Sequence, residues 1–264
     1  MASSHAVLHG SGDSSWRIVK RSDNDEYRAL LVDGADVYVA GMPCSGGVCQ
    51  GGLVDRSRNG GHSWQRTTFA SAAAGLSSDG RDVYLVLDGE LRFASDGFAS
   101  ARAIPLPAAR GIHAGGGELF AFGGIRDLTI VASSDGGGTW SSVYDAAGGS
   151  KSGHVDAMWS AGKIMFAVGN GASVPASAGV LLRSSDGGAS WRSVLLPAMD
   201  RASSVWGSAA NDVYVLGSQL LHSRDGANFS TVTLPGGTWQ VVWGTSARDL
   251  YVIGFDGAIL HGTR

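Results

Sequence analysis

Two stretches near the end of the chain, Val213-Tyr214-Val215-Leu216-Gly217 and Leu250-Tyr251-Val252-Ile253-Gly254, are copies of one another and decide the fold. Each follows a Trp-Gly pair by the same short interval, Trp206-Gly207 in one copy and Trp243-Gly244 in the other. Weaker copies lie upstream, and their aromatic residues mark a series: Tyr38, Tyr84, Phe120, Phe166, Tyr214 and Tyr251. A repeat of roughly 40 to 50 residues with four strands is typical of a β-propeller. The sequence therefore predicts an all-β fold with six four-stranded blades.

The strands of one repeat can be predicted directly from short apolar or alternating runs that turn residues bound. In the fifth repeat we expect strands at 202–206, 212–216, 219–223 and 230–234. Applied to the whole chain, the pattern predicts a single propeller domain over 1–264, with blades at approximately 26–71, 72–108, 109–151, 152–199, 200–236 and 237–262 plus 14–20.

Composition agrees with strands and turns. The 264 residues include 41 glycines, and 44% of the chain is hydrophobic. Aspartate far outnumbers glutamate, a balance that favours turns over helix surfaces. The net charge of −3 and the pI near 6.1 provide no field that would attract nucleic acid. We therefore expect no nucleic-acid partner.

Export is suggested by the two cysteines. Cys44 and Cys49 are separated by four residues, and a disulfide between them would close a hairpin loop, the alternative being two free thiols. Their spacing does not match a zinc motif, and we expect neither a metal nor a cofactor. No apolar run is long enough to span a membrane, and no signal peptide is recognisable at the start. We expect a secreted or periplasmic protein without membrane insertion.

A second motif lies between the predicted third and fourth strands. Residues 133–140 and 184–191 both match S-x-D-x-G-x-[ST]-W, and residues 57–64 match it with Asn in place of Asp. Decayed copies occur at 95–97 and 223–226. We expect the aspartate to accept hydrogen bonds from backbone amides of the turn, and the tryptophan to pack between sheets. The residues concerned are Asn59, Trp64, Asp135, Trp140, Asp186, Trp191 and Asp225.

This motif resembles the Asp-box, the bacterial-neuraminidase repeat. Propellers of this type include sialidases, xyloglucanases, sortilin-type receptor domains and photosystem assembly factors resembling Hcf136. The resemblance implies a fold element on the rim rather than a catalytic one. A sialidase needs a tyrosine paired with glutamate, whereas this chain contains only Glu26, Glu90 and Glu118. A xyloglucanase uses a cleft between two propellers, whereas we expect this chain to form a single propeller.

We expect the N-terminal segment to close the ring. The last repeat ends after its third strand, and Ser14–Lys20 can supply the fourth, with Trp16 at the motif's tryptophan position. Such pairing would hide both sheet edges. However, Ala6–Gly10 duplicates Ala258–Gly262, so two segments compete for one position.

The connections around the pore are the expected binding face, since loops of a repeat protein carry its function. Two loops there are unusually long, 41–52 and 169–179. Three arginines from three blades could bind an anionic group, and Asp156 with Asp200 could form an acid/base pair. We expect a non-catalytic protein that binds a glycan or a protein; the alternatives are a sialidase-like glycosidase and an assembly factor. The candidate ligand-binding residues are Tyr27, Arg28, Arg110, His113, His154, Asp156, Asp200, Arg201 and Trp239.

Overall fold

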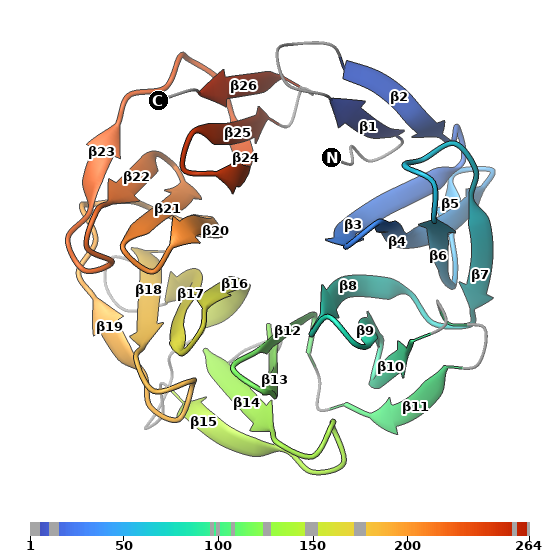
Figure 1. Cartoon of the computed structure of the whole chain (residues 1–264), viewed down its shortest axis with the longest axis horizontal. Helices are drawn as coiled ribbons and strands as arrows, with labels where there is room; N and C mark the ends of the chain where they lie inside the picture. Colours follow the sequence, from blue (N-terminus) through green and yellow to red (C-terminus); the bar gives the residue numbers. More distant parts are fainter. Residues whose placement is uncertain are drawn as a thin grey trace. The chain divides into compact units, whose positions relative to one another are not determined.

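The computed structural model describes residues 6–10, 16–95, 98, 101–106, 109–123, 128–145, 153–171, 178–254 and 258–262. Within these ranges all regular secondary structure is β, with antiparallel pairing throughout (Figure 1). The chain divides into two compact units, Met1–Ala114 (unit 1) and Gly115–Arg264 (unit 2). The fold is a six-bladed β-propeller, as the repeat predicts, and each blade is one antiparallel sheet.

Unit 1 contains a hairpin, two complete sheets and the first strand of a third. The hairpin pairs β1 (Ala6–Gly10) with β2 (Trp16–Arg21). The first sheet has the order β3-β4-β6-β7, and the short β5 pairs with β4 beside it. The second has the order β8-β9-β10-β11. The strands are β3 (Asp25–Asp33), β4 (Asp36–Ser45), β5 (Val48–Cys49), β6 (Gly52–Ser57), β7 (Gln65–Phe69), β8 (Ala73–Ser78), β9 (Val83–Leu87), β10 (Glu90–Ala94), β11 (Arg102–Pro105) and β12 (Gly111–Gly115).

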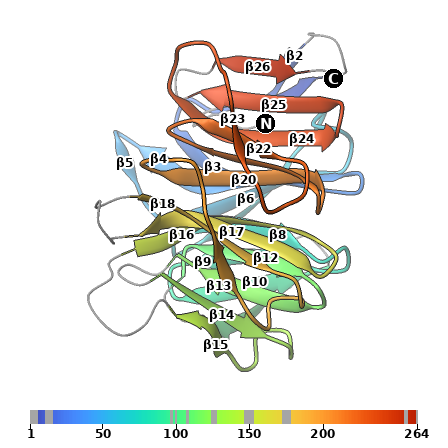
Figure 2. The ribbon, with the colours of Figure 1, turned by 90° about the vertical axis from the view of Figure 1, so that its left-hand side faces the viewer.

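Unit 2 continues the series. Its first sheet has the order β12-β13-β14-β15, with β12 as the inner strand. The next two sheets have the orders β16-β17-β18-β19 and β20-β21-β22-β23. The last has the order β24-β25-β26, and its three strands lie side by side in Figure 2. The strands are β13 (Glu118–Phe122), β14 (Thr129–Ser133), β15 (Ser141–Asp145), β16 (Gly153–Ala161), β17 (Ile164–Gly171), β18 (Ala178–Ser184), β19 (Arg192–Val194), β20 (Ala202–Ala209), β21 (Asp212–Gly217), β22 (Leu220–Ser223), β23 (Ser230–Val232), β24 (Trp239–Ser246), β25 (Asp249–Gly254) and β26 (Ile259–Gly262).

The sequence predicted the strands of the fifth repeat within a few residues. β20 extends beyond the expected end because it continues through a register shift after Gly207. The outer strand β23 stops at Val232 rather than at Leu234, just ahead of Pro235. Val232 pairs with Leu220, the first residue of β22, so the ladder ends there for lack of a partner.

The segment Ala6–Gly10 has a defined role in the structure. It pairs with β2, from Ala6 opposite Arg21 to Gly10 opposite Trp16. Val7 of this hairpin is buried with Val39 and Leu53 of the first sheet. Residues 11–15 lie outside the described ranges, so the structure covers only Trp16–Lys20 of the predicted closing strand. Closure of the ring by that strand remains a prediction.

The Trp-Gly pairs join neighbouring sheets of unit 2. A Cβ added to Gly207 would lie 2.7 Å from Cη2 of Trp159, and one added to Gly244 would lie 2.6 Å from Cη2 of Trp206. Each tryptophan ring therefore rests on the backbone of a glycine in the following sheet, and no larger residue fits at that glycine. Trp159 and Trp206 also lie beside Phe166 and Tyr214 of their own sheets.

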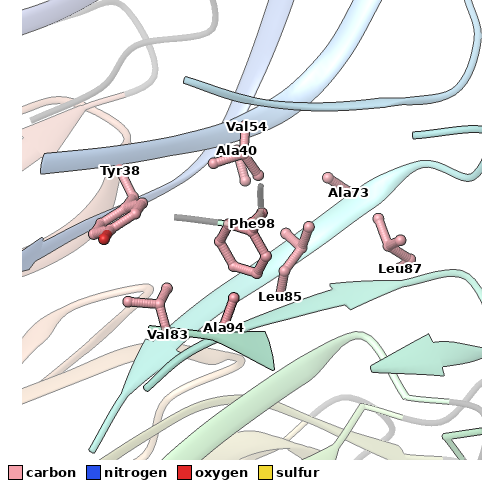
Figure 3. Packing of buried hydrophobic residues seen from close by; sticks show 9 residues of the cluster. All are labelled: Tyr38, Ala40, Val54, Ala73, Val83, Leu85, Leu87, Ala94 and Phe98. Atoms are coloured by element: carbon pink, nitrogen blue, oxygen red, sulfur yellow. The ribbon is translucent and has the colours of Figure 1, made fainter. Parts of the chain in front are cut away.

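Apolar residues of facing sheets form the core. In unit 1 one cluster joins the first and second sheets, and Figure 3 shows Phe98 among the side chains of Ala40, Val54, Leu85 and Ala94. In unit 2 Phe120 and Phe166 are fully buried at the equivalent aromatic positions of their repeats. Burying a side chain of this size contributes roughly 1.5–3 kcal/mol. The aromatic residues that define the repeat are therefore core residues.

In the turns with the serine–aspartate motif, the aspartate side chain accepts hydrogen bonds from the turn itself, as expected. Oδ1 of Asp135 accepts a hydrogen bond from the Thr139 amide at 2.9 Å, and Oδ2 accepts one from the Thr139 hydroxyl. Gly136 and Gly137 have φ of 72° and 92°. These bonds, led by that of the Thr139 amide, lower the pKa of Asp135 to about 2. The decayed copy at Asp225 differs because its carboxylate accepts from the backbone amides of Ala227 and Asn228 instead.

In the described part of the chain there is no helix that could cross a membrane.

Candidate functional site

A candidate site of polar side chains in mutual contact lies in unit 2. It is formed where β16 begins and β17 ends. His154 and Asn170 are direct partners in the β16–β17 ladder, and the register shifts between Val155 and Ala157. This irregularity leaves Asp156 outside the regular ladder, and such bulges re-aim a side chain at the end of a strand.

Both oxygens of the Asp156 carboxylate are held by neighbouring side chains. Nε2 of His154 lies 3.2 Å from Oδ1, and Nδ2 of Asn170 donates to Oδ2 at 3.1 Å. The His154 side chain is 46% exposed whereas that of Asp156 is only 20% exposed. The carboxylate is therefore fixed beneath a ring that faces solvent. We call His154, Asp156, Asn170 and Arg201 the His154 cluster.

Burial sets the electrostatics of this cluster. It raises the pKa of Asp156, and the interactions of the carboxylate with His154 and Arg201 oppose that shift. Oδ1 of Asn170 is buried and accepts no hydrogen bond from the residues that the structure describes. An unsatisfied buried acceptor is costly, and the donor bond to Asp156 is what holds this amide in place.

The charge of Arg201, which lies just before β20, also acts on Asp156, and the backbone at this residue packs closely against β21. The Arg201 carbonyl accepts a hydrogen bond from the Ser218 amide at 3.2 Å. A Cβ on Gly217 would lie 1.5 Å from that carbonyl oxygen, so the approach requires glycine. The Asp200 amide donates to the Ser218 hydroxyl at 3.2 Å, and the Asp200 side chain is exposed.

The structure thus brings two predicted residues, His154 and Asp156, into contact, and adds one that the sequence analysis missed; of the third predicted residue, Arg201, it shows the effect of its charge on Asp156. Asn170 lies in the predicted long loop 169–179, where β17 extends to Gly171; residues 172–177 are outside the described ranges. Glycines on both sides concealed a strand end, and only the pairing of Asn170 with His154 reveals it. Trp239 is half-buried against the core of the last sheets, and its Nε1 donates to the Pro235 carbonyl at 3.2 Å.

The predicted residues of unit 1 do not form one site within that unit. Tyr27 is buried, and burial together with the Asp55 charge raises its pKa to about 12. It belongs to the interior and does not face a ligand on an exposed loop. Arg28 is exposed and donates to Glu26 at 3.1 Å, and Arg110 is exposed beside β12. Burial lowers the pKa of His113 to about 4, so this histidine is neutral at pH 7.

A charged network of two buried carboxylates and an exposed arginine lies beside Tyr27. Arg66 donates two hydrogen bonds to Asp55, at 2.8 and 2.7 Å, and a third to Asp25 at 2.6 Å. Nζ of Lys20 lies 3.0 Å from the same Asp55 carboxylate, which is 1% exposed. A buried charge must be paired, and here two cations balance two anions. The network joins β2 to the first sheet and is structural.

Cys44 and Cys49 form a disulfide across the β4–β5 hairpin. The connecting residues Gly46 and Gly47 have φ of 58° and 81°, as a two-residue hairpin turn requires. The Glu26 carboxylate lies within 4.8 Å of both sulfur atoms. Disulfide sulfur carries no thiolate, so this group is not a metal site.

Comparison with known proteins identifies the architecture. No family model matches the sequence, and no curated protein matches it significantly. Among solved structures, YCF48 from Cyanidioschyzon merolae is 13% identical with a TM-score of 0.58, over 95% of this chain and 99% of that one.

Two longer proteins match over less than half of their own length. The GH74 xyloglucanase from Xanthomonas campestris is 14% identical with a TM-score of 0.65, over 88% of this chain and 44% of that one. The extracellular domain of the BT4673 hybrid two-component system from B. thetaiotaomicron is 10% identical with a TM-score of 0.71, over 99% of this chain and 38% of that one. At these identities the likeness shows the fold alone, which is that of a β-propeller.

Proposed function

We propose that this chain is a non-catalytic binding or scaffold protein that engages a protein or glycan partner through the His154 cluster. The observation that carries the proposal is the engagement of both Asp156 oxygens by His154 and Asn170. A general acid or base must be free to reach the proton it transfers. Here the carboxylate orients an exposed imidazole, and the charge of the exposed Arg201 acts on the same carboxylate, so the cluster presents an oriented polar surface to a partner.

Two further features support binding rather than glycoside hydrolysis. Arg28 is engaged by Glu26, which removes one of the three arginines from an anion-binding set. The chain also corresponds to 44% of the GH74 enzyme, less than the whole of a protein that carries that activity. The motif turns retain the Asp-box interpretation as a structural element, in which Asp135 and Asp186 organise their own turns.

An assembly factor is the second candidate. The observation that favours it is the His154 cluster itself, because an exposed, preorganised polar cluster suits a peptide as well as a glycan. YCF48 matches this chain over nearly the whole length of both proteins, and YCF48 has itself been solved bound to D1 peptide. The Cys44–Cys49 disulfide supports an exported protein, because disulfides persist in oxidising compartments.

The test compares Arg201→Ala with Arg224→Ala. Both arginines are exposed, but Arg224 lies in the β22–β23 turn, at the opposite end of the strands of this sheet. Each protein is applied to a glycan array and a peptide array, and is assayed on a panel of 4-methylumbelliferyl glycosides. We expect array binding that falls at least tenfold in Arg201→Ala and is unchanged in Arg224→Ala, since a charged hydrogen bond is worth roughly 1.5–3 kcal/mol.

Sustained glycoside turnover that Arg201→Ala abolishes would overturn the non-catalytic assignment. Empty arrays, or binding that both variants retain, would overturn the assignment of the His154 cluster as the binding surface.

A further inference from the structure

Three side chains of the His154 cluster form a closed triangle of contacts. Nε2 of His154 lies 3.2 Å from Oδ1 of Asp156, and Nδ2 of Asn170 lies 3.1 Å from Oδ2 of the same carboxylate. The third side of the triangle joins Nδ2 of Asn170 to Nε2 of His154, at 3.5 Å. Each side chain therefore contacts the other two, and the available hydrogen atoms must serve all three pairs.

No placement of hydrogen atoms satisfies all three contacts at once. An ionised Asp156 only accepts, so His154 and Asn170 must both donate to it, and these two donors then face each other. If Nε2 of His154 accepts from Asn170 instead, it faces an Asp156 oxygen that also accepts. A protonated Asp156 would donate to Nε2, but the single lone pair of that nitrogen would then meet two donors. Hydrogen bonding alone therefore does not explain the arrangement.

A bound cation removes the mismatch, because it takes a lone pair from each group. Zinc binds nitrogen and oxygen ligands at about 2.1 Å, and two such ligands in tetrahedral geometry are about 3.4 Å apart. Nε2 of His154 lies at a similar separation from its two neighbours, 3.2 Å from Asp156 and 3.5 Å from Asn170. Imidazole nitrogen with carboxylate and amide oxygen is a ligand set for divalent transition cations.

Asn170 can supply the oxygen that this ligand set needs. Its Oδ1 is buried and accepts no hydrogen bond from the residues that the structure describes. A half-turn about the Cβ–Cγ bond exchanges the two ends of the amide, which have nearly the same shape. The oxygen then takes the place of Nδ2, 3.1 Å from Asp156 and 3.5 Å from His154. The exchange breaks no hydrogen bond of Oδ1.

The backbone holds two of these ligands in register. His154 and Asn170 lie opposite each other in the β16–β17 ladder, so their side chains share one face of the sheet. A Cβ on Gly169 would lie 1.9 Å from the His154 carbonyl oxygen, and one on Gly153 would lie 2.6 Å from the Asn170 carbonyl oxygen. Both approaches require glycine. Ligands fixed on strands in this way are organised before a cation arrives.

We propose that His154, Asp156 and Asn170 form a binding site for a divalent transition cation such as Zn²⁺. Three protein ligands leave further coordination positions for water or for an oxygen of a partner. The sequence analysis expects no metal because it relies on cysteine and histidine spacing, whereas Asn170 joins the site through the ladder. The site shares its residues with the proposed function but goes beyond it, since a cation binds without a partner.

Titration calorimetry of the untagged whole chain, dialysed against EDTA and then metal-free buffer, tests the site with ZnCl₂ and MnCl₂. We expect one equivalent of Zn²⁺ to bind with a micromolar dissociation constant. His154→Ala and Asn170→Leu should each weaken binding at least tenfold, because each removes a ligand. Asn170→Asp keeps an oxygen and should bind at least as tightly as wild type. His261→Ala is the matched control, because His261 pairs with Asp249 at 2.6 Å in the last sheet, and it should leave the affinity unchanged.

Two further measurements separate coordination from a loss of structure. In long-range ¹H–¹⁵N NMR spectra, one equivalent of Zn²⁺ should shift Nε2 of His154 and leave Nε2 of His261 in place. Zn²⁺ should also raise the Tm of wild type and of Asn170→Asp, because a ligand that binds only the folded state stabilises it. The Tm of His154→Ala should not respond.

Arg201→Ala separates this site from the proposed function. The charge of Arg201 acts on Asp156, so its removal should leave Zn²⁺ binding as tight or tighter, while binding to the arrays falls. Zn²⁺ binding with empty arrays would support the metal site and overturn the proposed function alone. Failure of both cations to bind, an unshifted Nε2 of His154, or equal affinity for wild type and Asn170→Leu would overturn the metal site. Array binding that persists in EDTA would then leave the proposed function standing.

Discussion

The turns at residues 57–64 of unit 1 and 184–191 of unit 2 have the same shape but different chemistry. In unit 2 Oδ1 of Asp186 accepts from the Ser190 amide at 3.0 Å, and in unit 1 Oδ1 of Asn59 accepts from the Ser63 amide at 2.9 Å. The second bond reverses direction. The Ser190 hydroxyl donates to the carboxylate, whereas Nδ2 of Asn59 donates to the Ser63 hydroxyl. The turn therefore requires a planar acceptor of the right length and does not require its charge.

The tryptophans of the two turns differ in their reach. Nε1 of Trp191 donates to Gly188 within its own turn at 2.9 Å. Nε1 of Trp64 donates to the equivalent Gly61 carbonyl at 3.1 Å and also to the Val19 carbonyl of β2 at 3.1 Å. The unit 1 turn thus attaches the N-terminal hairpin as well as closing its own sheet.

We expect the largest loss of stability from a substitution that disrupts the packing of a turn against the neighbouring sheet. Gly188→Ala should destabilise the protein by about 2–5 kcal/mol, because Gly188 has φ of 93° and a Cβ would lie 2.3 Å from Cε1 of the buried Phe120. Gly136→Ala is the control, since its φ of 72° is similar but nothing lies within 4 Å. It should cost only about 1–2 kcal/mol. Urea unfolding measures both, and equal losses would contradict a packing role for Gly188.

The next prediction tests whether the two turns are equivalent at their serine. Oγ of Ser184 accepts from the buried Gly188 amide at 2.8 Å, and Oγ of Ser57 accepts from the Gly61 amide at 2.8 Å. Ser184→Ala and Ser57→Ala should each cost about 1–3 kcal/mol, because each leaves a buried N–H unsatisfied. The free energies of unfolding should be similar for the two variants. A loss in one turn alone would show that the shared shape has different energetics in the two units.

The smallest effect concerns charge. The Ser190 and Ser184 hydroxyls lower the pKa of Asp186 from 3.8 to about 2. A carboxyl with a lowered folded-state pKa contributes stability above its unfolded pKa, and this contribution is lost as the pH falls from 3.8 through about 2. Asp186→Asn should therefore lower Tm at pH 7, where the ionised carboxylate contributes stability, and flatten the acid limb of Tm against pH, whereas Asn59→Asp should steepen that limb. A ¹³C titration of the Asp186 carboxyl checks the pKa directly, and a midpoint near 3.8 would refute the cause.

The repeat could be predicted from the sequence because large aromatic residues mark it at regular intervals along the chain. Tyr214 and Tyr251 occupy the same buried position in successive sheets, so packing and spacing agree. The His154 cluster was predicted only in part. His154 and Asp156 are close in sequence, but Asn170 joins them through a ladder and a register shift that no local pattern encodes. The burial of Tyr27 beside the charges of Asp55 and Arg66 has the same origin, because those residues come from two other strands.

Trp243 occupies the same position in β24 as Trp206 does in β20, yet it remains 42% exposed. Trp159 and Trp206 each rest on the glycine of a following sheet within unit 2, whereas β24 belongs to the last sheet of that unit. A half-exposed indole that stacks on Tyr251 is an intrinsic optical reporter, because its emission depends on the polarity around it. The emission of Trp243, isolated by replacing the other tryptophans with phenylalanine, would report directly on anything that comes to cover this end of unit 2.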